Sequence, residues 1–246
     1  MKKLQALIFD VDGTLAETER DGHRPAFNDA FAELGLDWHW DETLYGELLA
    51  ITGGKERLRH YAARYAPGLA AGAGFDDLIQ RLHATKTAHY VRRVNAGNLP
   101  LRPGVAEVIR AARASGIRLA IATTTSPENV SALLDTSLAP GAADWFEVIG
   151  AGDIVASKKP APDIYHWVLD RLALPASACL AIEDSENGLR AALAAGLNCL
   201  VTLSEYTRGQ DFSGAAAVLG DLADLSLSRA LQLTAKAAGA PACASA

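Results

Sequence analysis

The stretch at residues 6–19, ALIFDVDGTLAETE, decides the fold. Four apolar residues run directly into a turn that carries Asp10 and Asp12. A short apolar run bounded by charge predicts a buried strand, and open α/β sheets bind ligands where such strands end. Glu17 and Glu19 complete a set of four carboxylates, which repel one another unless a cation or a proton relieves them. The stretch therefore predicts a strand that delivers acidic groups to a site.

Composition narrows the class of protein. The chain has 246 residues, of which 50% are hydrophobic and 21% charged, and its formal net charge is −6. It has no basic run of the kind that binds nucleic acid, no apolar run long enough to span a bilayer, and no secretory signal pattern at its start. Cys179, Cys199 and Cys243 are widely spaced and are expected to be free thiols. We expect a cytoplasmic monomer without nucleic-acid or membrane partners.

Periodicity divides the chain into two kinds of segment. Helical spacing without a convincing strand runs from about residue 16 to 97, whereas strands and helices alternate from residue 101 onward. This pattern predicts a doubly wound parallel-sheet α/β core, Rossmann-like, from residues 1–15 and 98–246, with an inserted all-helical cap of residues 16–97. Pro103 is expected to open the first core helix, and a last helix is expected at 227–239, before a frayed tail.

Polar side chains follow the predicted strands at their carboxyl ends. Carboxylates, hydroxyls and ammonium groups that converge on one edge of a sheet suit a metal ion and a phosphate group. In chain order these residues are Asp10, Asp12, Thr123, Thr124, Lys158, Lys159, Glu183 and Asp184.

Four short motifs carry a family resemblance. They are DVDGT at 10–14, ATTTS at 122–126, KKPAPD at 158–163 and EDSENG at 183–188. In this order and spacing they resemble the four motifs of the haloacid dehalogenase-like phosphatase superfamily. The resemblance covers the whole expected core and implies the Rossmann-like fold of that superfamily with a cap.

Three other kinds of site fit the pattern less well. A calcium-binding loop has its glycine two positions later than Gly13 and follows a helix, whereas a strand is expected here. A phosphoacceptor receiver domain is about half this length and carries its phosphorylated aspartate after a middle strand, whereas Asp10 follows the first. A haloalkanoate dehalogenase of the same superfamily needs neither Asp12 nor a metal, so Asp12 together with Asp184 favours phosphate chemistry.

The residue types at the first and last motifs suit phosphoryl transfer. Asp10 can attack phosphorus to form an aspartyl-phosphate, and Asp12 can protonate the leaving oxygen and then deprotonate the attacking water. An anionic nucleophile facing an anionic phosphate needs a cation, for which Mg²⁺ suits oxygen ligands. The resemblance implies ligation by the Asp10 carboxylate, the Asp12 main-chain oxygen and Asp184, with Glu183 assisting directly or through water.

The two middle motifs complete the expected catalytic set. The resemblance implies that Thr123 hydrogen-bonds the transferring phosphoryl group and that a lysine neutralises its charge. The family places this lysine directly before PAPD, which makes it Lys159 and leaves Lys158 as a surface charge. The expected catalytic residues are thus Asp10, Asp12, Thr123 and Lys159.

The expected cap contains TGGKER at residues 52–57. Two glycines and a lysine that open a helix expose backbone amides, which bind anions. Alternatively, Gly53 and Gly54 form only a turn and Lys55 is a solvated charge. If the core holds one phosphate, a second anion site in the cap favours a substrate with two phosphates or a long polar one.

Cap sequences sharpen the resemblance. AETERDGHRPAFNDAF, WDETLYGELL and TGGKERL are similar to the CbbY-type branch and to its xylulose-1,5-bisphosphate phosphatases, which remove an inhibitor of carbon fixation. The resemblance implies hydrolysis of xylulose 1,5-bisphosphate, a small-molecule sugar bisphosphate, to xylulose 5-phosphate. It also implies substrate contacts from both parts of the chain, by Glu17, His23, Thr52, Gly53, Gly54, Lys55, Glu56, Thr123, Thr124, Thr125, Ser126, Pro127, Glu128 and Asn129. His23 fits a polar helix start equally well.

Other functions stay open at this point. A phosphosugar mutase of the β-phosphoglucomutase type and a phosphatase for another small metabolite, such as phosphoglycolate, share the same motifs. A phosphosugar-binding protein without turnover fits poorly, because the whole acidic set is present. Several further residues are not expected to act on the substrate. Glu19 is expected to be a solvated charge, and Arg102 a solvated loop arginine rather than a phosphate ligand. Trp38 and Trp40 are expected to pack in the cap, and His60, His83, His89 and His166 to have structural roles in helices.

Overall fold

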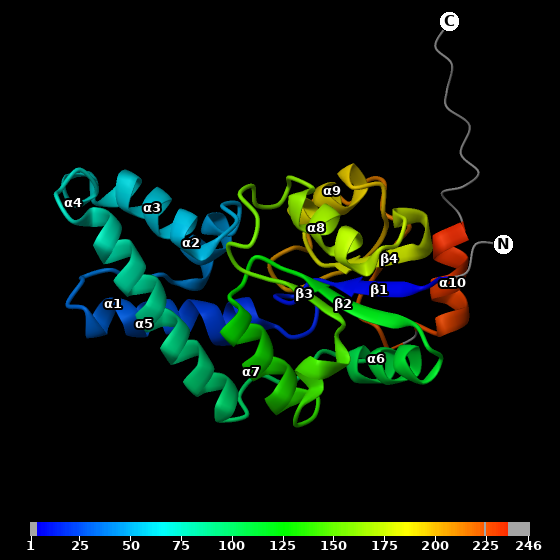
Figure 1. Ribbon diagram of the computed structural model, residues 1–246. Helices are drawn as coiled ribbons and strands as arrows, with labels where there is room; N and C mark the ends of the chain where they lie inside the picture. The colour runs from blue at the N-terminus through cyan, green and yellow to red at the C-terminus, as the bar shows by residue number, and fades with distance from the viewer. Residues whose placement is uncertain (1–3, 224, 236–246) are drawn as a thin grey trace, which may run out of the picture.

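Six parallel strands form one sheet in the computed structural model, which describes residues 4–223 and 225–235 (Figure 1). Chain order reverses beside β1, so that β2 and β4 flank it, and such a reversal is where doubly wound sheets bind ligands. The doubly wound α/β fold predicted from the sequence is confirmed. In spatial order the strands are β3 (Val148–Gly150), β2 (Arg118–Ala122), β1 (Ala6–Phe9), β4 (Cys179–Glu183), β5 (Asn198–Thr202) and β6 (Ala217–Leu219).

Helices cover both faces of the sheet. Because side chains alternate along a strand, Leu7 and Phe9 of β1 enter one core cluster while Ala6 and Ile8 enter the other, and all four are fully buried. A strand buried on both faces reads as a continuous apolar run, as β1 does. The first cluster is covered by α6 (Val105–Ala114), α7 (Pro127–Ser137) and α10 (Leu227–Ala235), the second by α8 (Asp163–Leu172) and α9 (Glu186–Ala194).

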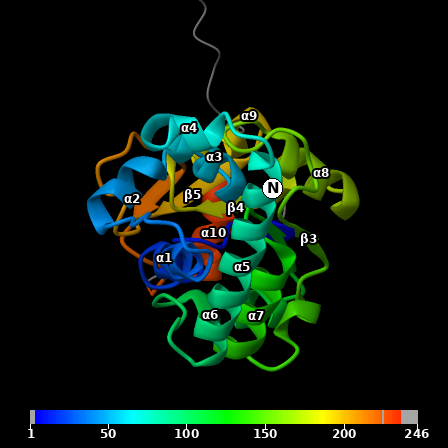
Figure 2. The same cartoon turned by 90° about the vertical axis from the view of Figure 1, so that its left-hand side faces the viewer.

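A helical segment, residues 19–95, lies beyond the carboxyl ends of the strands (Figures 1 and 2). It has its own aromatic core, in which fully buried Trp40 packs against Phe27 and Phe31, and Trp38 against Phe31. The expected packing role of both tryptophans is confirmed, and no strand occurs in the described residues of this segment. Its elements are a π-helical turn η1 (Glu19–His23), α1 (Arg24–Glu33), α2 (Glu42–Leu48), α3 (Gly54–Tyr65), α4 (Pro67–Ala70) and α5 (Phe75–Asn95).

Two local predictions need correction. The first core helix begins at Val105 and not at Pro103, because Gly104 has φ +79° and the turn packs against Leu222, whose N–H donates to the Pro103 carbonyl at 3.1 Å. The π-helical turn η1 was not expected either. A Cβ at its Gly22 would lie 2.8 Å from the Tyr90 ring, so this glycine lets the turn pack closely on α5.

The C-terminal part of the chain is described as far as the last helix. The last helix is described as far as Ala235, and the end expected for it, the tail and Cys243 lie outside the described residues. Among the described helices, none is both long and apolar enough for a membrane span.

Candidate active site

The turn after β1 brings the first motif to the fourth. The Asp10 N–H donates to the Ile182 carbonyl of β4 at 2.9 Å, which continues the ladder by one residue. Gly13 has φ +80°, and a Cβ on it would lie 2.1 Å from Asp184 Oδ2. Only glycine permits this close approach, so the sequence DVDGT folds here with the acidic end of β4 directly beside it.

Lys159 is buried between two carboxylates. Its Nζ lies 2.7 Å from Asp10 Oδ1 and 2.6 Å from Glu183 Oε1, and it donates to the Ala122 carbonyl at 2.8 Å. Burial opposes the ammonium charge, but the carboxylates of Asp10 and Glu183 raise the pKa of Lys159. The structure thus brings Lys159 to the first motif, whereas Lys158 donates instead to the Gly152 carbonyl at 2.5 Å.

Three carboxylates beside Lys159 form an acidic cluster. In the described residues, Asp10, Glu183 and Asp184 each offer an oxygen within 4.8 Å of the others. Burial raises the pKa of Asp10 to about 8, although the positive charge of Lys159 opposes this rise. Burial and the negative charge of Asp10 also raise the pKa of Asp184. Glu183 Oε1 accepts from Lys159 and Tyr165, but Glu183 Oε2 is buried without a partner. A divalent cation suits such a cluster, because it would neutralise the charge and use the free oxygen.

Asp12 is held by residues of the helical segment and the approach to it. Its Oδ1 accepts from Thr18 Oγ1 at 2.6 Å and lies 2.8 Å from His23 Nε2, while Lys86 Nζ lies 2.7 Å from His23 Nδ1. The His23 ring thus bridges Lys86 and Asp12, with Nε2 placed to donate a hydrogen bond to the Asp12 carboxylate. Burial opposes ionisation, but His23 and Thr18 lower the pKa of Asp12 to about 2.

Of the two roles expected for His23, the structure shows the helix start, because His23 stands directly before α1. It is 3% exposed and stacks on Tyr90 with ring centroids 4.3 Å apart, so it contacts the acid–base candidate and not the main cavity. Lys86, which the sequence did not single out, completes this chain of contacts. The only available signal was a lysine among the apolar positions of α5, which is ambiguous without the fold.

A cavity of about 240 Å³ lies above the acidic cluster. Its floor comes from the strand ends and its roof from the helical segment. It is lined by nine expected residues, Asp10, Asp12, Glu17, Thr52, Gly53, Thr123, Thr124, Lys159 and Asp184, and by Gly13 of the turn. The unexpected lining residues are Glu19, Leu49, Ala50, Arg57, Ser185, Glu186, Asn187, Ser204, Tyr206, Thr207 and Gln210.

Glu19 is not the solvated charge that was expected. Its side chain is 19% exposed, its Oε2 accepts from Tyr45 OH at 2.5 Å, and Arg57 Nη1 lies 3.8 Å away. Arg57 is 6% exposed and also donates to the Leu48 carbonyl at 3.2 Å. The π-helical turn aims Glu19 inward, and no sequence signal announced that turn.

The TGGKER loop divides between two cavities. Thr52 and Gly53 line the main one, and Asn187 Nδ2 of α9 donates to Thr52 Oγ1 at 3.1 Å. Lys55 instead lies 2.6 Å from Asp153 Oδ2. It lines a neighbouring cavity of about 430 Å³ together with Gly54 and other residues: Gly53, Glu56, His83, Ala84, Thr87, Thr124, Ser126, Pro127, Glu128, Gly152, Asp153 and Lys158. The main cavity thus receives only part of the expected loop.

The TTTSPEN loop divides in the same way. Thr123 and Thr124 line the main cavity, and Ser126 caps α7 by accepting from the Asn129 N–H at 3.4 Å. Asn129 is 1% exposed and its Nδ2 donates to Thr125 Oγ1 at 3.1 Å, so this pair supports the loop and lies outside the main cavity. Pro127 and Glu128 face the neighbouring cavity.

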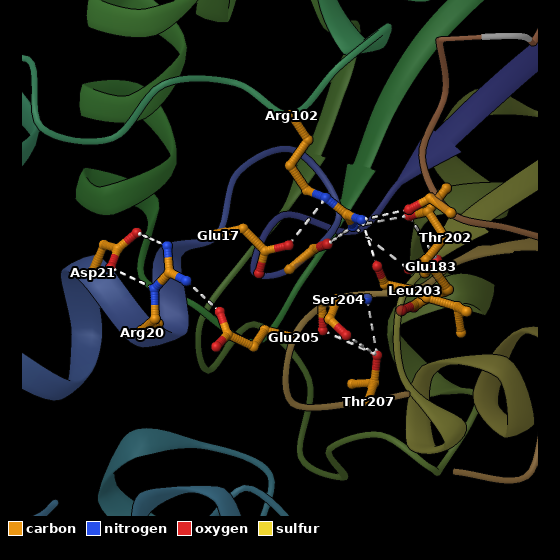
Figure 3. Close-up of polar contacts among 12 residues, drawn as sticks. Glu17, Arg20, Asp21, Arg102, Glu183, Thr202, Leu203, Ser204, Glu205 and Thr207 are labelled. Carbon is orange, nitrogen blue, oxygen red and sulfur yellow. Dashed lines mark hydrogen bonds and ion pairs between the residues drawn. The ribbon is translucent and has the colours of Figure 1, made fainter. Parts of the chain in front are cut away.

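Arg102 is neither solvated nor directed at the cavity. It is 8% exposed, and its Nε lies 3.3 Å from Glu17 Oε1 while its other nitrogens reach main-chain carbonyls (Figure 3). Glu17, expected only as a substrate contact, is therefore also the ion-pair partner of a buried arginine.

Two cysteines and His89 lie away from the main cavity. Cys179 and Cys199 are buried free thiols, as expected. His89 Nε2 lies 2.7 Å from Glu33 at the surface. No histidine belongs to a metal-ligating group in the described part of the chain.

Comparisons with known proteins identify the family of this chain. A family model for haloacid dehalogenase-like hydrolases matches residues 4–196. Protein CbbY of Cupriavidus necator (plasmid) is 54% identical over 224 residues, which cover 90% of this chain and 87% of that protein. Protein CbbY of Cereibacter sphaeroides is 48% identical over 235 residues, which cover 96% and 100%.

Solved structures show the same likeness. CbbY from Rhodobacter sphaeroides in complex with phosphate has a TM-score of 0.85 at 47% identity, covering 93% of this chain and 99% of that one. A mutant of CbbY from the same organism in complex with xylulose 1,5-bisphosphate has a TM-score of 0.84 at 46% identity, covering 92% and 98%. The chain therefore belongs to the haloacid dehalogenase-like hydrolase family, which confirms the prediction of a phosphatase of that family.

Proposed function

We propose that this enzyme hydrolyses xylulose 1,5-bisphosphate to xylulose 5-phosphate in a Mg²⁺-dependent reaction that passes through an aspartyl-phosphate. One observation carries the proposal. Asp10, its partner Lys159 and Asp184 line the floor of a cavity that the helical segment covers, and buried Glu183 pairs with Lys159 beside them. A nucleophile, a fixed ammonium group and hard oxygen ligands thus meet at one place, which suits a phosphate group.

The chain's own residues provide two half-reactions. In the first, an Asp10 carboxylate oxygen bonds to phosphorus, the bond from phosphorus to the sugar oxygen breaks, and Asp12 donates its proton to that oxygen. In the second, Asp12 takes a proton from a water molecule, the oxygen of that water bonds to phosphorus, and the bond between phosphorus and the Asp10 oxygen breaks, which releases phosphate and restores the Asp10 carboxylate. With its pKa lowered to about 2, Asp12 is ionised before substrate binds. The negative charge of a bound phosphate raises that pKa, so Asp12 takes up the proton that it donates in the first half-reaction, and it regains this proton from water in the second.

Two further residues act on the transferring group. The Lys159 ammonium, already 2.7 Å from Asp10 Oδ1, offsets the negative charge that builds up between nucleophile and phosphate. Thr123 is 1% exposed at the end of β2 and offers its hydroxyl to a phosphate oxygen. Both groups are fixed before substrate arrives, so little reorganisation is needed during the reaction.

The residues present fit Mg²⁺. Asp10, Glu183 and Asp184 would hold it, since their carboxylates lie close together with raised pKa values for two of them and one unpartnered oxygen. When bound, Mg²⁺ supplies positive charge that lets anionic nucleophile and anionic phosphate approach.

We further propose that residues 16–97 act as a cap that selects the substrate. Thr52, Gly53 and Arg57 of this part reach over the main cavity, and Lys55 lies in the neighbouring cavity. Two adjoining cavities that both contain basic groups suit a substrate with a phosphate at each end. The bisphosphate bound by the CbbY mutant supports this choice of substrate.

A phosphate-release screen tests the proposal. Purified enzyme with Mg²⁺ is given xylulose 1,5-bisphosphate, ribulose 1,5-bisphosphate, phosphoglycolate and β-glucose 1-phosphate, with the Asp10→Asn variant as the blank. The highest kcat/KM is expected for xylulose 1,5-bisphosphate. Preference for phosphoglycolate would contradict the bisphosphate assignment. Sustained conversion of β-glucose 1-phosphate to glucose 6-phosphate, with catalytic glucose 1,6-bisphosphate and no free phosphate, would show a mutase instead.

A further inference from the structure

Arg102 gathers more main-chain oxygens than any surface role would require. Its Nη2 donates to the carbonyls of Leu203 at 2.6 Å and Gly220 at 2.9 Å, and its Nη1 to Thr202 Oγ1 at 3.2 Å. Nη1 also donates to the Gly13 carbonyl. These contacts come from the ends of β5 and β6 and from the turn of the first motif, and they converge on one guanidinium group (Figure 3).

The Gly13 contact links Arg102 to the chemistry. Gly13 follows Asp12 directly, and Asp184 Oδ2 occupies the space where a Cβ of Gly13 would lie. A shift of the Gly13 carbonyl therefore moves the acid–base carboxylate and disturbs the packing of the acidic cluster. Arg102 itself does not line the main cavity, so it acts on the reaction only through these neighbours.

Arg102 also stands where the chain returns from the helical segment. Its N–H donates to the Leu15 carbonyl at 2.8 Å, and Leu101 forms an antiparallel bridge with Ala16. The outgoing and returning connections are thus paired, and the ion pair between Arg102 Nε and Glu17 Oε1 at 3.3 Å adds a second tie. The same side chain that holds the catalytic turn is therefore anchored to both connections.

We propose that Arg102 is a positioning residue: it holds the turn of Asp10–Gly13 in its catalytic geometry and couples that turn to the connections of the helical segment. A buried guanidinium offers five planar donors, and no other side chain can satisfy so many carbonyl oxygens at once. The proposal rests on the proposed phosphatase mechanism, because its consequence is the placement of Asp12.

The test separates positioning from mere stability. Arg102→Ala should lower kcat by about 10- to 100-fold with KM changed much less, because a small misplacement of catalytic groups costs this much. Arg102 borders a surface cavity of about 340 Å³, so added guanidinium ion, at concentrations far below denaturing ones, can enter and should restore much of kcat. Urea, which has similar shape without the charge, should not restore it.

Two matched variants complete the design. Ile109→Ala removes a fully buried side chain of α6 away from the site, so it should lower the melting temperature but keep kcat per folded molecule. Arg118→Ala breaks an ion pair with Glu147 at the start of β2, the end of the strand away from the site, and should change neither the melting temperature nor kcat. If Arg102→Ala does not fold, Arg102→Lys replaces it and should show a smaller loss of kcat that guanidinium does not restore.

Three results would contradict the positioning role of Arg102. Unchanged kcat per folded molecule in Arg102→Ala or Arg102→Lys, a rise in KM alone, or guanidinium rescue of melting temperature without rescue of kcat would overturn the positioning role. The assays use p-nitrophenyl phosphate beside xylulose 1,5-bisphosphate. A wild type that hydrolyses only the first compound would contradict the proposed substrate, and would still allow the Arg102 comparison.

Discussion

The floor and the roof of the candidate site are held by different forces. On the floor, Asp10, Lys159 and Glu183 are 7%, 5% and 0% exposed and are joined by hydrogen-bonded ion pairs. Between the roof and the loop after β3, Lys55 pairs with Asp153, and these side chains are 22% and 60% exposed. Removing one partner of a buried pair leaves an uncompensated charge and costs about 3–5 kcal/mol, whereas an exposed pair is worth about 0–1 kcal/mol.

This contrast predicts different functions for the floor and the roof of the site. A floor that is costly to rearrange keeps the nucleophile and its partners in place between turnovers. The exposed pair of Lys55 and Asp153 can break at little cost, so the loop of residues 52–57 can move to admit substrate while the buried contact of His23 to Asp12 is kept. Variants of the floor should therefore abolish chemistry, and variants of the roof should adjust substrate affinity.

The largest effect is expected for Asp10→Asn. The amide keeps the volume of the side chain but is not a nucleophile, so phosphate release should fall by about 10⁴-fold or more. The melting temperature should not decrease, because Glu183 Oε1 still pairs with Lys159 at 2.6 Å and the amide at position 10 carries no charge to bury. Phosphate release and thermal unfolding measure the two quantities, and retention of normal turnover would contradict the mechanism.

Metal removal tests the floor as a whole. In metal-free protein, Asp10 has a folded pKa of about 8 against an ordinary 3.8, so the folded state holds a proton that the unfolded state releases. The free energy of unfolding should then fall as pH rises from about 4 to 8. Mg²⁺ favours the ionised carboxylates and should reduce this fall, which thermal unfolding at several pH values would detect.

Asp184→Asn is the matched variant for the metal. It should lose the Mg²⁺-induced rise in melting temperature and lose about 10³-fold in kcat, since a catalytic metal ion contributes several kcal/mol. Equal stabilisation of wild type and variant by Mg²⁺ would show that the cluster is not the metal site.

His23 links roof to floor, and its removal should have an intermediate effect. His23→Ala deletes one of the two groups that contact Asp12 Oδ1 and leaves Thr18, so the pKa of Asp12 should rise from about 2 towards its ordinary 3.8. The acidic limb of the kcat/KM profile should shift to higher pH, and kcat should fall by about 10²-fold. His89→Ala, which loses contacts to Glu33, Asp29 and Arg92 and none to Asp12, is the control. An unshifted acidic limb would argue against this role.

Sequence reasoning succeeded where strand register determines position. The ladder between β1 and β4 fixes where Asp10 and Asp184 stand, and apolar runs with polar ends announced both strands. The parallel sheet and the convergence of the motifs follow from this one pattern. Such positions depend on local alternation and on chain direction, which the sequence contains.

The same reasoning failed where tertiary packing aims a side chain. Glu19 turns inward on a π-helical turn, the Arg102 side chain is buried among carbonyls from three segments, and Lys55 pairs with Asp153. Each partner lies far away in sequence or depends on irregular backbone. A motif can name the loop that approaches the site, but it does not say which of its side chains enters the cavity.

The smallest effect is expected at the ties between roof and floor. Lys55 and Lys158 both lie 2.6 Å from the Asp153 carboxylate, whose pKa their hydrogen bonds lower to about 2. Because Lys55→Ala removes an exposed pair worth at most about 1 kcal/mol, KM for xylulose 1,5-bisphosphate should rise by no more than about fivefold at unchanged kcat. Steady-state kinetics at low and high salt measure it, and the effect should shrink at high salt.

A double-mutant cycle separates a tie from a direct substrate contact. If Lys55 acts only through Asp153, then Asp153→Asn should raise KM by a similar factor, and the double variant should be no worse than either single one. If Lys55 instead binds the second phosphate, Lys55→Ala should weaken the bisphosphate more than p-nitrophenyl phosphate, and Asp153→Asn should strengthen binding by freeing the ammonium group. The sign of the Asp153→Asn effect therefore decides whether the roof closes by its own contacts or by those of the substrate.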